Sequence, residues 1–339
     1  MTATGTSSIR PPTEEHAHAW GFGARGLLRR PRWRPRGRKE KFNKREAIAG
    51  LLFISPWIVG FLIFTVISMS WSLVLSFTNY DLVTNTMAPV GGANYERLVE
   101  NPRVLMSLGN TFTYAVMAVP VEVAMALLIA MLLNSVRRGA GIFRVIYYLP
   151  KMTPVVATAA VFLLLLNGNQ GAINKALAAV GIQGPQWLLD PTWVKPSIVL
   201  MSAWAVAGSA VILLAALQGV PQELYESASI DGAGRLSQFF RITLPMISPT
   251  LFFIVITLSI ASLQVFDQAY LLFYRDGAAS AAPDAALFYG VYLYQQAFQQ
   301  FNFGFAAAMS WLLFVIIMLI TVVQLTVGNR IVHYEGDRR

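Results

Sequence analysis

Two charged side chains lie inside long apolar stretches of this chain. Glu122 falls near the middle of the stretch 111–133, and Lys151 lies about two and a half turns into the stretch 142–166. A charge at the centre of a membrane-spanning helix costs about 2.5–3.5 kcal/mol on insertion scales, so both residues need partners or water. Antiparallel helices would place them at depths within about one turn of each other. We therefore predict an ion pair or two water-facing groups, and a role in gating or solute passage stays open.

Polar and aromatic side chains recur in the later apolar stretches. Hydroxyl and amide groups can hydrogen-bond a polar ligand such as a sugar, and aromatic faces can stack on its ring. The same side chains can instead bond their own helix backbone, and tryptophan often lies at a membrane interface. The candidates for a substrate pathway are Trp204, Ser209, Ser262, Gln264, Ser310 and Trp311, with Ser202 and Ser259 as further hydroxyl groups.

A polar segment between the fourth and fifth apolar stretches has the residues of a short helix. Pro221 suits a first helical position, and Glu223 suits the positive start of a helix. Gly232 can adopt the left-handed conformation that ends a helix. We therefore predict a helix over about 221–230.

A second short helix should follow this turn. Asp231 is placed to cap it, and it must stop or bend near Pro245. Ser227 and Ala228 are small, so the first helix is thin on one side and a partner protein can approach closely. From physical chemistry alone, such a helix pair could also lie in lipid headgroups.

The segment resembles the EAA loop of ABC importer permeases. The resemblance rests on Tyr225-Glu226-Ser227-Ala228-Ser229-Ile230-Asp231-Gly232-Ala233-Gly234 and on the later Ile242-Thr243-Leu244-Pro245, with a serine where the family has the first alanine of its motif. It implies that this loop is cytoplasmic and couples the chain to an ATPase subunit. The coupling residues that it implies are Glu226, Ser227, Ala228, Asp231, Gly232, Ala233, Leu244 and Pro245.

The resemblance extends over about residues 44–330, where the chain is similar to the first permease of maltose, lactose and glycerol-phosphate importers. Segments 187–191, 266–270 and 292–310 carry it, whereas 273–278 lacks the family's Thr-x-Gly-Gly-Pro turn. It implies a permease subunit of an ATP-driven, binding-protein-dependent importer for an oligosaccharide, disaccharide or polyol derivative. The implied partners are a second homologous permease, an ATPase dimer that uses ATP and Mg²⁺, and an extracytoplasmic solute-binding protein, with no cofactor on this chain.

Composition independently indicates a membrane protein. Hydrophobic residues make up 55% of the chain and charged residues only 13%, about half the usual charged share. We predict an all-α polytopic membrane protein with six transmembrane helices and a cytoplasmic coupling-helix loop between helices 4 and 5. The apolar stretches long enough to span are 48–77, 111–133, 142–166, 197–217, 250–266 and 305–327.

The distribution of charge predicts the orientation. Residues 1–46 contain twelve basic and four acidic side chains, which supply +8 of the net charge of +9. The positive-inside rule therefore puts both termini on the cytoplasmic side after an even number of spans. The resemblance implies that the membrane is a bacterial inner membrane. We predict a disordered basic tail over 1–46, a permease domain over 47–330 and a cytoplasmic tail over 331–339. The basic tail could also contact anionic membrane lipid, and we expect no cleavable signal peptide and no nucleic-acid partner.

Several activities lack their required residues in this sequence. The histidines, His16, His18 and His333, all lie outside the apolar stretches, and the chain contains no cysteine. We therefore expect no metal site and no Ser-His type of catalysis. No P-loop motif is present, so ATP hydrolysis is expected in a separate subunit and this chain is not expected to be an enzyme. The alternative is a self-sufficient secondary transporter or channel, which would predict internal repeats.

Overall fold

The computed structural model describes residues 44–81, 86–136, 138–274 and 283–331. The predicted basic tail lies outside the described residues up to residue 43, as do residues 332–339 of the predicted C-terminal tail and residues 275–278 of the segment that departs from the family turn. The chain divides into two units, Met1–Phe61 and Leu62–Arg339, which are described separately. In the first unit, helix α1 (Lys44–Phe61) exposes its large apolar side chains, as a lipid-facing helix does.

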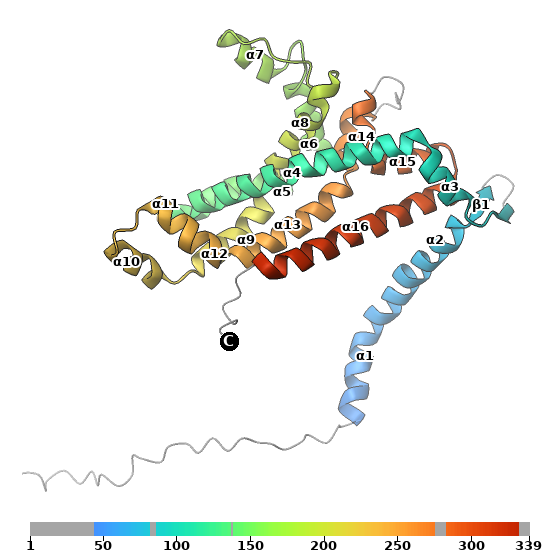
Figure 1. Cartoon of the computed structure of the whole chain (residues 1–339), viewed down its shortest axis with the longest axis horizontal. Helices are drawn as coiled ribbons and strands as arrows, with labels where there is room; N and C mark the ends of the chain where they lie inside the picture. The colour runs from blue at the N-terminus through green and yellow to red at the C-terminus, as the bar shows by residue number, and fades with distance from the viewer. Residues whose placement is uncertain (1–43, 82–85, 137, 275–282, 332–339) are drawn as a thin grey trace, which may run out of the picture. The chain divides into compact units, whose positions relative to one another are not determined.

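The helices and strands described in the second unit are all helices apart from one small antiparallel hairpin, and loops join them (Figure 1). The hairpin pairs β1 with β2 in the register Thr78 to Pro89. The elements in chain order are η2 (Leu62–Ile67), α2 (Ser68–Ser76), β1 (Thr78–Asp81), β2 (Thr86–Pro89), α3 (Ala93–Glu100), α4 (Pro102–Ser135), α5 (Ala140–Met152), α6 (Val155–Leu165), α7 (Ala172–Ala179), α8 (Pro191–Trp204), α9 (Ala207–Gln218), α10 (Gln222–Ile230), α11 (Arg235–Gln238), η3 (Phe239–Thr243), α12 (Leu244–Met246), α13 (Ser248–Leu263), α14 (Asp267–Phe273), η4 (Asp284–Ala286), α15 (Tyr289–Tyr294), η5 (Gln295–Gln299) and α16 (Phe303–Ile331).

Half of the predicted spans are continuous helices and half are bent pairs. Among the described residues, Ile48–Ser76, Pro102–Ser135 and Phe303–Gly328 are each long and apolar enough to cross a membrane. Three further pairs pass the same test together and bend by 93° (α5 with α6), 53° (α8 with α9) and 68° (Arg235–Met246 with α13). The structure therefore has three to six spans, depending on whether each bent pair crosses once.

The bend between α5 and α6 is where the sequence predicts it. Pro150 and Pro154 flank the break. They interrupt the helix because a proline removes a backbone donor and clashes with the preceding turn. The fourth predicted span, 197–217, falls within the α8–α9 pair, which bends between Trp204 and Ala207, a break that the apolar window did not indicate.

Two helices begin earlier than the apolar windows suggest. The Asn101 side chain accepts a hydrogen bond from the backbone N–H of Arg103 at 2.9 Å, and Pro102 occupies the first helical turn of α4. Asp190 and Pro191 repeat this arrangement at the start of α8. Both pairs are favourable helix starts. Hydropathy placed these helices several residues too late because it detects apolar surface and not capping groups.

The long helix α4 is the centre of the second unit. It packs against α8, α9, α13 and α15. Ala118, Ala126 and Ala130 of α4 are fully buried, and Ala210 of α9 is nearly so. Small residues let helix backbones approach closely where lipid gives no hydrophobic driving force for association. The packing leaves α10–α12 at one end of the unit and α14 and α15 at the other (Figure 1).

Candidate functional site

The polar loop folds as a short helix with a defined stop. Helix α10 spans Gln222–Ile230, one residue shorter than predicted because Pro221 precedes its first turn. Gly232 has φ +78°, its N–H donates to the Ser229 carbonyl at 3.1 Å, and the Ala233 N–H donates to the Ala228 carbonyl at 2.9 Å. These two bonds form a Schellman motif, in which the left-handed residue lets the chain satisfy the last helical carbonyls.

The predicted capping role of Asp231 was wrong. Asp231 has φ −72° and ψ 2° and is the C-terminal cap residue of α10. The residue that precedes α11 is Gly234, and no side chain caps that helix. A side chain caps a helix start only from an extended backbone directly before the first turn, and the Schellman turn places Asp231 too early in the chain for this.

Hydrogen bonds join the loop into one unit. The Tyr225 hydroxyl and Thr243 Oγ1 lie 2.9 Å apart, which connects α10 to η3. Gln238 Nε2 donates to Ser229 Oγ at 2.9 Å and to the Ala233 carbonyl at 3.1 Å, which connects α11 to α10 and to the turn. Side chains on both arms of the loop therefore hold its helices together.

The loop also presents an exposed surface. Glu226, Ser227, Asp231 and Gly232 are exposed, while the other proposed coupling residues, Ala228, Ala233, Leu244 and Pro245, are partly buried. Apolar side chains lie among them: Ile230 is 87% exposed, and Leu224, Leu236 and Phe240 are also exposed. Exposed apolar groups beside a rigid backbone are typical of a surface that docks a partner.

Replacing Gly232 by alanine should loosen this loop. A Cβ at Gly232 would meet open space, so the expected effect comes only from the left-handed backbone, which disfavours an L side chain by about 1–2 kcal/mol. Gly234→Ala is the matched control, since its Cβ also meets open space and its φ is −69°. Hydrogen exchange over 222–240 should rise in Gly232→Ala and not in Gly234→Ala. Equal exchange in both variants would contradict the role of the turn.

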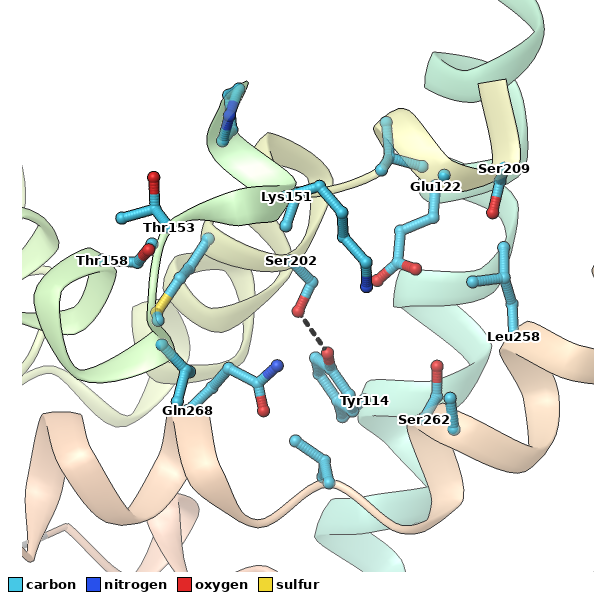
Figure 2. A pocket seen from close by; sticks show the side chains of 18 of the residues that line it. Tyr114, Glu122, Lys151, Thr153, Thr158, Ser202, Ser209, Leu258, Ser262 and Gln268 are labelled. Atoms are coloured by element: carbon cyan, nitrogen blue, oxygen red, sulfur yellow. Dashed lines mark hydrogen bonds between the residues drawn. The ribbon is translucent and has the colours of Figure 1, made fainter. Parts of the chain in front are cut away.

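A cavity of about 480 Å³ lies within the helices of the second unit. Breaks in three helices reach it, at Thr153, at Ala205 and Val206, and at Val265. Non-helical backbone at membrane depth is tolerated where it lines a cavity, which suits the α5–α6 and α8–α9 bends and the α13–α14 junction that lie here. Its polar lining residues are Tyr114, Glu122, Lys151, Thr153, Thr158, Ser202, Ser209, Ser262 and Gln268 (Figure 2).

Glu122 and Lys151 face each other in this cavity. The Lys151 side chain extends toward the Glu122 carboxylate (Figure 2). Glu122 is only 7% exposed, whereas Lys151 is exposed in this chain. Their charges interact electrostatically, and no direct ion pair joins these two described side chains. Of the two predicted arrangements, the structure therefore has two cavity-facing groups.

A hydrogen bond crosses the cavity beside this pair. The Tyr114 hydroxyl of α4 and Ser202 Oγ of α8 lie 2.7 Å apart (Figure 2). Ser209 and Ser262 line the cavity from α9 and α13, and Gln268 does so from α14. Hydroxyl, amide, carboxylate and ammonium groups from seven helices thus line one volume, which suits a ligand with many hydroxyl groups.

The predicted pathway residues divide into two groups. Ser209 and Ser262 line the cavity. Trp204 is exposed and its ring contacts Phe162, and Gln264 is exposed at the end of α13, so neither lines the cavity. Ser310 and Trp311 line a separate, smaller pocket with Met69, Ser72 and Phe314. The sequence did not point to Tyr114, Thr153, Thr158 and Gln268 as cavity residues. A usable signal existed for two of them, because Thr153 directly precedes Pro154 and Thr158 follows it by one turn.

Comparison with known proteins identifies the family. Residues 122–333 match the family described as binding-protein-dependent transport system inner membrane component. This chain belongs to that family. The match includes both charged cavity residues and the whole of the α10–α12 loop.

Curated relatives cover most of this permease. It is 39% identical over 303 residues to the probable ABC transporter permease protein YesP of Bacillus subtilis, covering 88% of this chain and 96% of the relative. It is 32% identical over 287 residues to the arabinooligosaccharides transport system permease protein AraP of Halalkalibacterium halodurans, with 84% and 88% covered. It is also 32% identical over 283 residues to the lactose transport system permease protein LacF of Rhizobium radiobacter, with 82% and 93% covered.

A solved structure has the same fold. The permease matches a chain of a bacterial alginate ABC transporter in complex with an alginate pentasaccharide-bound periplasmic protein, with a TM-score of 0.73 and 24% identity. The match covers 85% of this chain and 96% of that chain. The all-α polytopic membrane fold predicted from the sequence is therefore confirmed.

Proposed function

We propose that this protein is the carbohydrate-translocating permease subunit of an ATP-driven importer. The observation that carries the proposal is the cavity, where two of the three bent helix pairs break and where polar side chains from several helices line a volume rich in hydroxyl groups. Relatives at about one-third identity are named for the transport of arabinooligosaccharides and lactose. An oligosaccharide, disaccharide or polyol derivative fits this cavity chemically, because its hydroxyl groups can pair with Tyr114, Ser202, Ser262 and Gln268.

The α10–α12 loop is proposed as the coupling surface for an ATPase. Its bracing by Tyr225 and Gln238 lets it move as a unit, and its exposed apolar residues supply a docking face. Closure of an ATPase dimer would push this loop and change which end of the cavity is open. ATP and Mg²⁺ would bind to the ATPase subunits. This chain would supply the α10–α12 loop that moves with them and the cavity through which the saccharide passes.

The remaining partners follow from the same scheme. A second homologous permease would complete the path, and an extracytoplasmic solute-binding protein would deliver the saccharide. The protein would lie in the bacterial inner membrane, with the α10–α12 loop and both termini in the cytoplasm. The basic excess in residues 1–46 supports this orientation.

Deleting the gene in its host should abolish uptake of one class of saccharide. We expect a plasmid copy of the full chain to restore uptake, and a copy in which the cavity is filled by Ser262→Phe and Ser202→Leu to insert normally without restoring it. Radiolabelled maltotriose, arabinotriose, lactose and trehalose are the test solutes, and a radiolabelled amino acid mixture is the control. Loss of amino acid uptake with unchanged saccharide uptake would overturn the carbohydrate assignment.

A further inference from the structure

Four aromatic side chains form a continuous row at the end of the unit opposite the coupling loop. This row, the aromatic ladder, consists of Phe266, Tyr270, Tyr294 and Phe298. The ring of Phe266 lies 5.2 Å from that of Tyr270 and 5.3 Å from that of Tyr294. Tyr294 is 5.1 Å from Tyr270 and 5.2 Å from Phe298, so each ring contacts the next one along the row.

The inner end of the aromatic ladder lies next to the cavity lining, although none of its four rings is part of that lining. Phe266 stands in the chain between Val265 and Gln268, and both of those residues line the cavity. Gly290 of α15 packs directly on this point, since a Cβ there would come to 2.9 Å from the Val265 carbonyl oxygen and 3.3 Å from Phe266 Cβ. The close approach holds the α15 rings beside the break that opens into the cavity.

The outer end of the aromatic ladder is open. Phe298 is 59% exposed and lies in the π-helical turn η5. Phe301 follows with 51% of its side chain exposed and φ +57°, a left-handed conformation that is unfavourable for a bulky residue. Its ring lies 6.4 Å from Phe303, whose ring is also 6.4 Å from Phe298. Strained backbone and π-turns often mark functional positions, and here both present aromatic rings outward.

We propose that the aromatic ladder is a second saccharide site, a track of stacking surfaces that passes a sugar between the outer surface and the cavity. Aromatic faces carry partial negative charge and the C–H groups of a sugar ring carry partial positive charge, so a ring face can hold a sugar without matching its hydroxyl pattern. Four aromatic rings in succession would each bind a sugar weakly. No single position would then hold the sugar tightly enough to stop its passage. This inference deepens the proposed function and rests on it.

Two simpler roles fit the arrangement less well. Aromatic residues gather in belts at membrane interfaces, but a belt surrounds a protein, whereas this row runs from one exposed tip to a cavity break. Packing alone explains the partly buried Phe266 and Tyr270, which contact the main apolar core. It does not explain the exposed Phe298 or the strained Phe301.

The test compares aromatic with aliphatic replacements in the assembled transporter. Tyr294→Leu and Phe298→Leu keep apolar bulk but remove the ring face, while Tyr294→Phe and Phe298→Trp keep a ring. We expect initial uptake of subsaturating maltotriose, arabinotriose or lactose to fall about tenfold in each Leu variant and to persist in the aromatic variants. Phe253→Leu is the matched control, because Phe253 is 54% exposed on α13 and lies outside the ladder.

Each outcome has a defined meaning. Native uptake by both Leu variants would overturn the track, and so would equal losses in the Leu and aromatic variants. A parallel pull-down with the solute-binding protein separates protein docking from sugar stacking, since loss of receptor binding in step with uptake would also overturn the track. If gene deletion leaves uptake of every test saccharide unchanged, the proposed function itself fails, which is distinct from a failure of the ladder alone.

Discussion

Glu226→Lys should abolish ATP-dependent uptake while the protein still inserts and folds. Glu226 is exposed on α10, and a surface substitution of this kind usually changes the free energy of unfolding by no more than about 0.5 kcal/mol. Reversing a charge at a docking surface creates repulsion where an attraction stood. A loss of about 3 kcal/mol in docking corresponds to roughly a hundredfold weaker association with the ATPase. The measurement is saccharide uptake in membrane vesicles together with co-purification of the ATPase.

The control for this prediction lies on the same helix. Glu223→Lys carries the same charge change less than one turn earlier, where the main expected loss is a favourable helix-end interaction of about 0.3–1 kcal/mol. Uptake should therefore survive Glu223→Lys to a large extent. Equal uptake by Glu226→Lys and the unaltered protein would remove Glu226 from the coupling surface.

Lys151→Met should reduce the yield of folded protein, and Glu122→Gln should restore much of it. Without Lys151, the buried Glu122 carboxylate loses the cation that it faces, and a buried charge without a compensating group is destabilising. Glu122→Gln alone should be milder, since Lys151 is exposed and can be solvated. A double-mutant cycle on the yield of monodisperse protein measures the coupling, which we expect at about 0.5–3 kcal/mol.

A second lysine provides the control for the cycle. Lys195 lies on α8 and does not line the cavity. Glu122→Gln should therefore not rescue Lys195→Met. Strictly additive losses for Glu122→Gln and Lys151→Met would mean that the residues act separately. If yield is normal and only uptake falls, the pair serves saccharide passage instead of folding.

Local chemistry made the fold of the α10–α12 loop predictable. The stop at Gly232 depends on one backbone conformation and on hydrogen bonds within six residues, so the sequence alone determines it. The apolar stretches and the break near Pro150 are equally local, because each reflects solvation or a missing backbone donor. Asp231 lies between two short helices, and the sequence alone does not show which of them it caps. The geometry of the turn makes it the C-terminal cap residue of α10 and not the N-terminal cap of α11.

Only the tertiary structure decided which polar side chains share a cavity. Helices α9 and α13 are apolar almost all round, so periodicity could not show which face of each helix is turned inward. Gln264 was predicted to face the pathway, but Gln268 is the glutamine that lines the cavity. Tyr114 lies far along the chain from Ser202, and α4 packing against α8 brings them together. The sequence determined the spans, the charge asymmetry and the loop, because those properties are summed along the chain. The cavity and the aromatic ladder depend on helix rotation and on bends, which are set by contacts between distant segments.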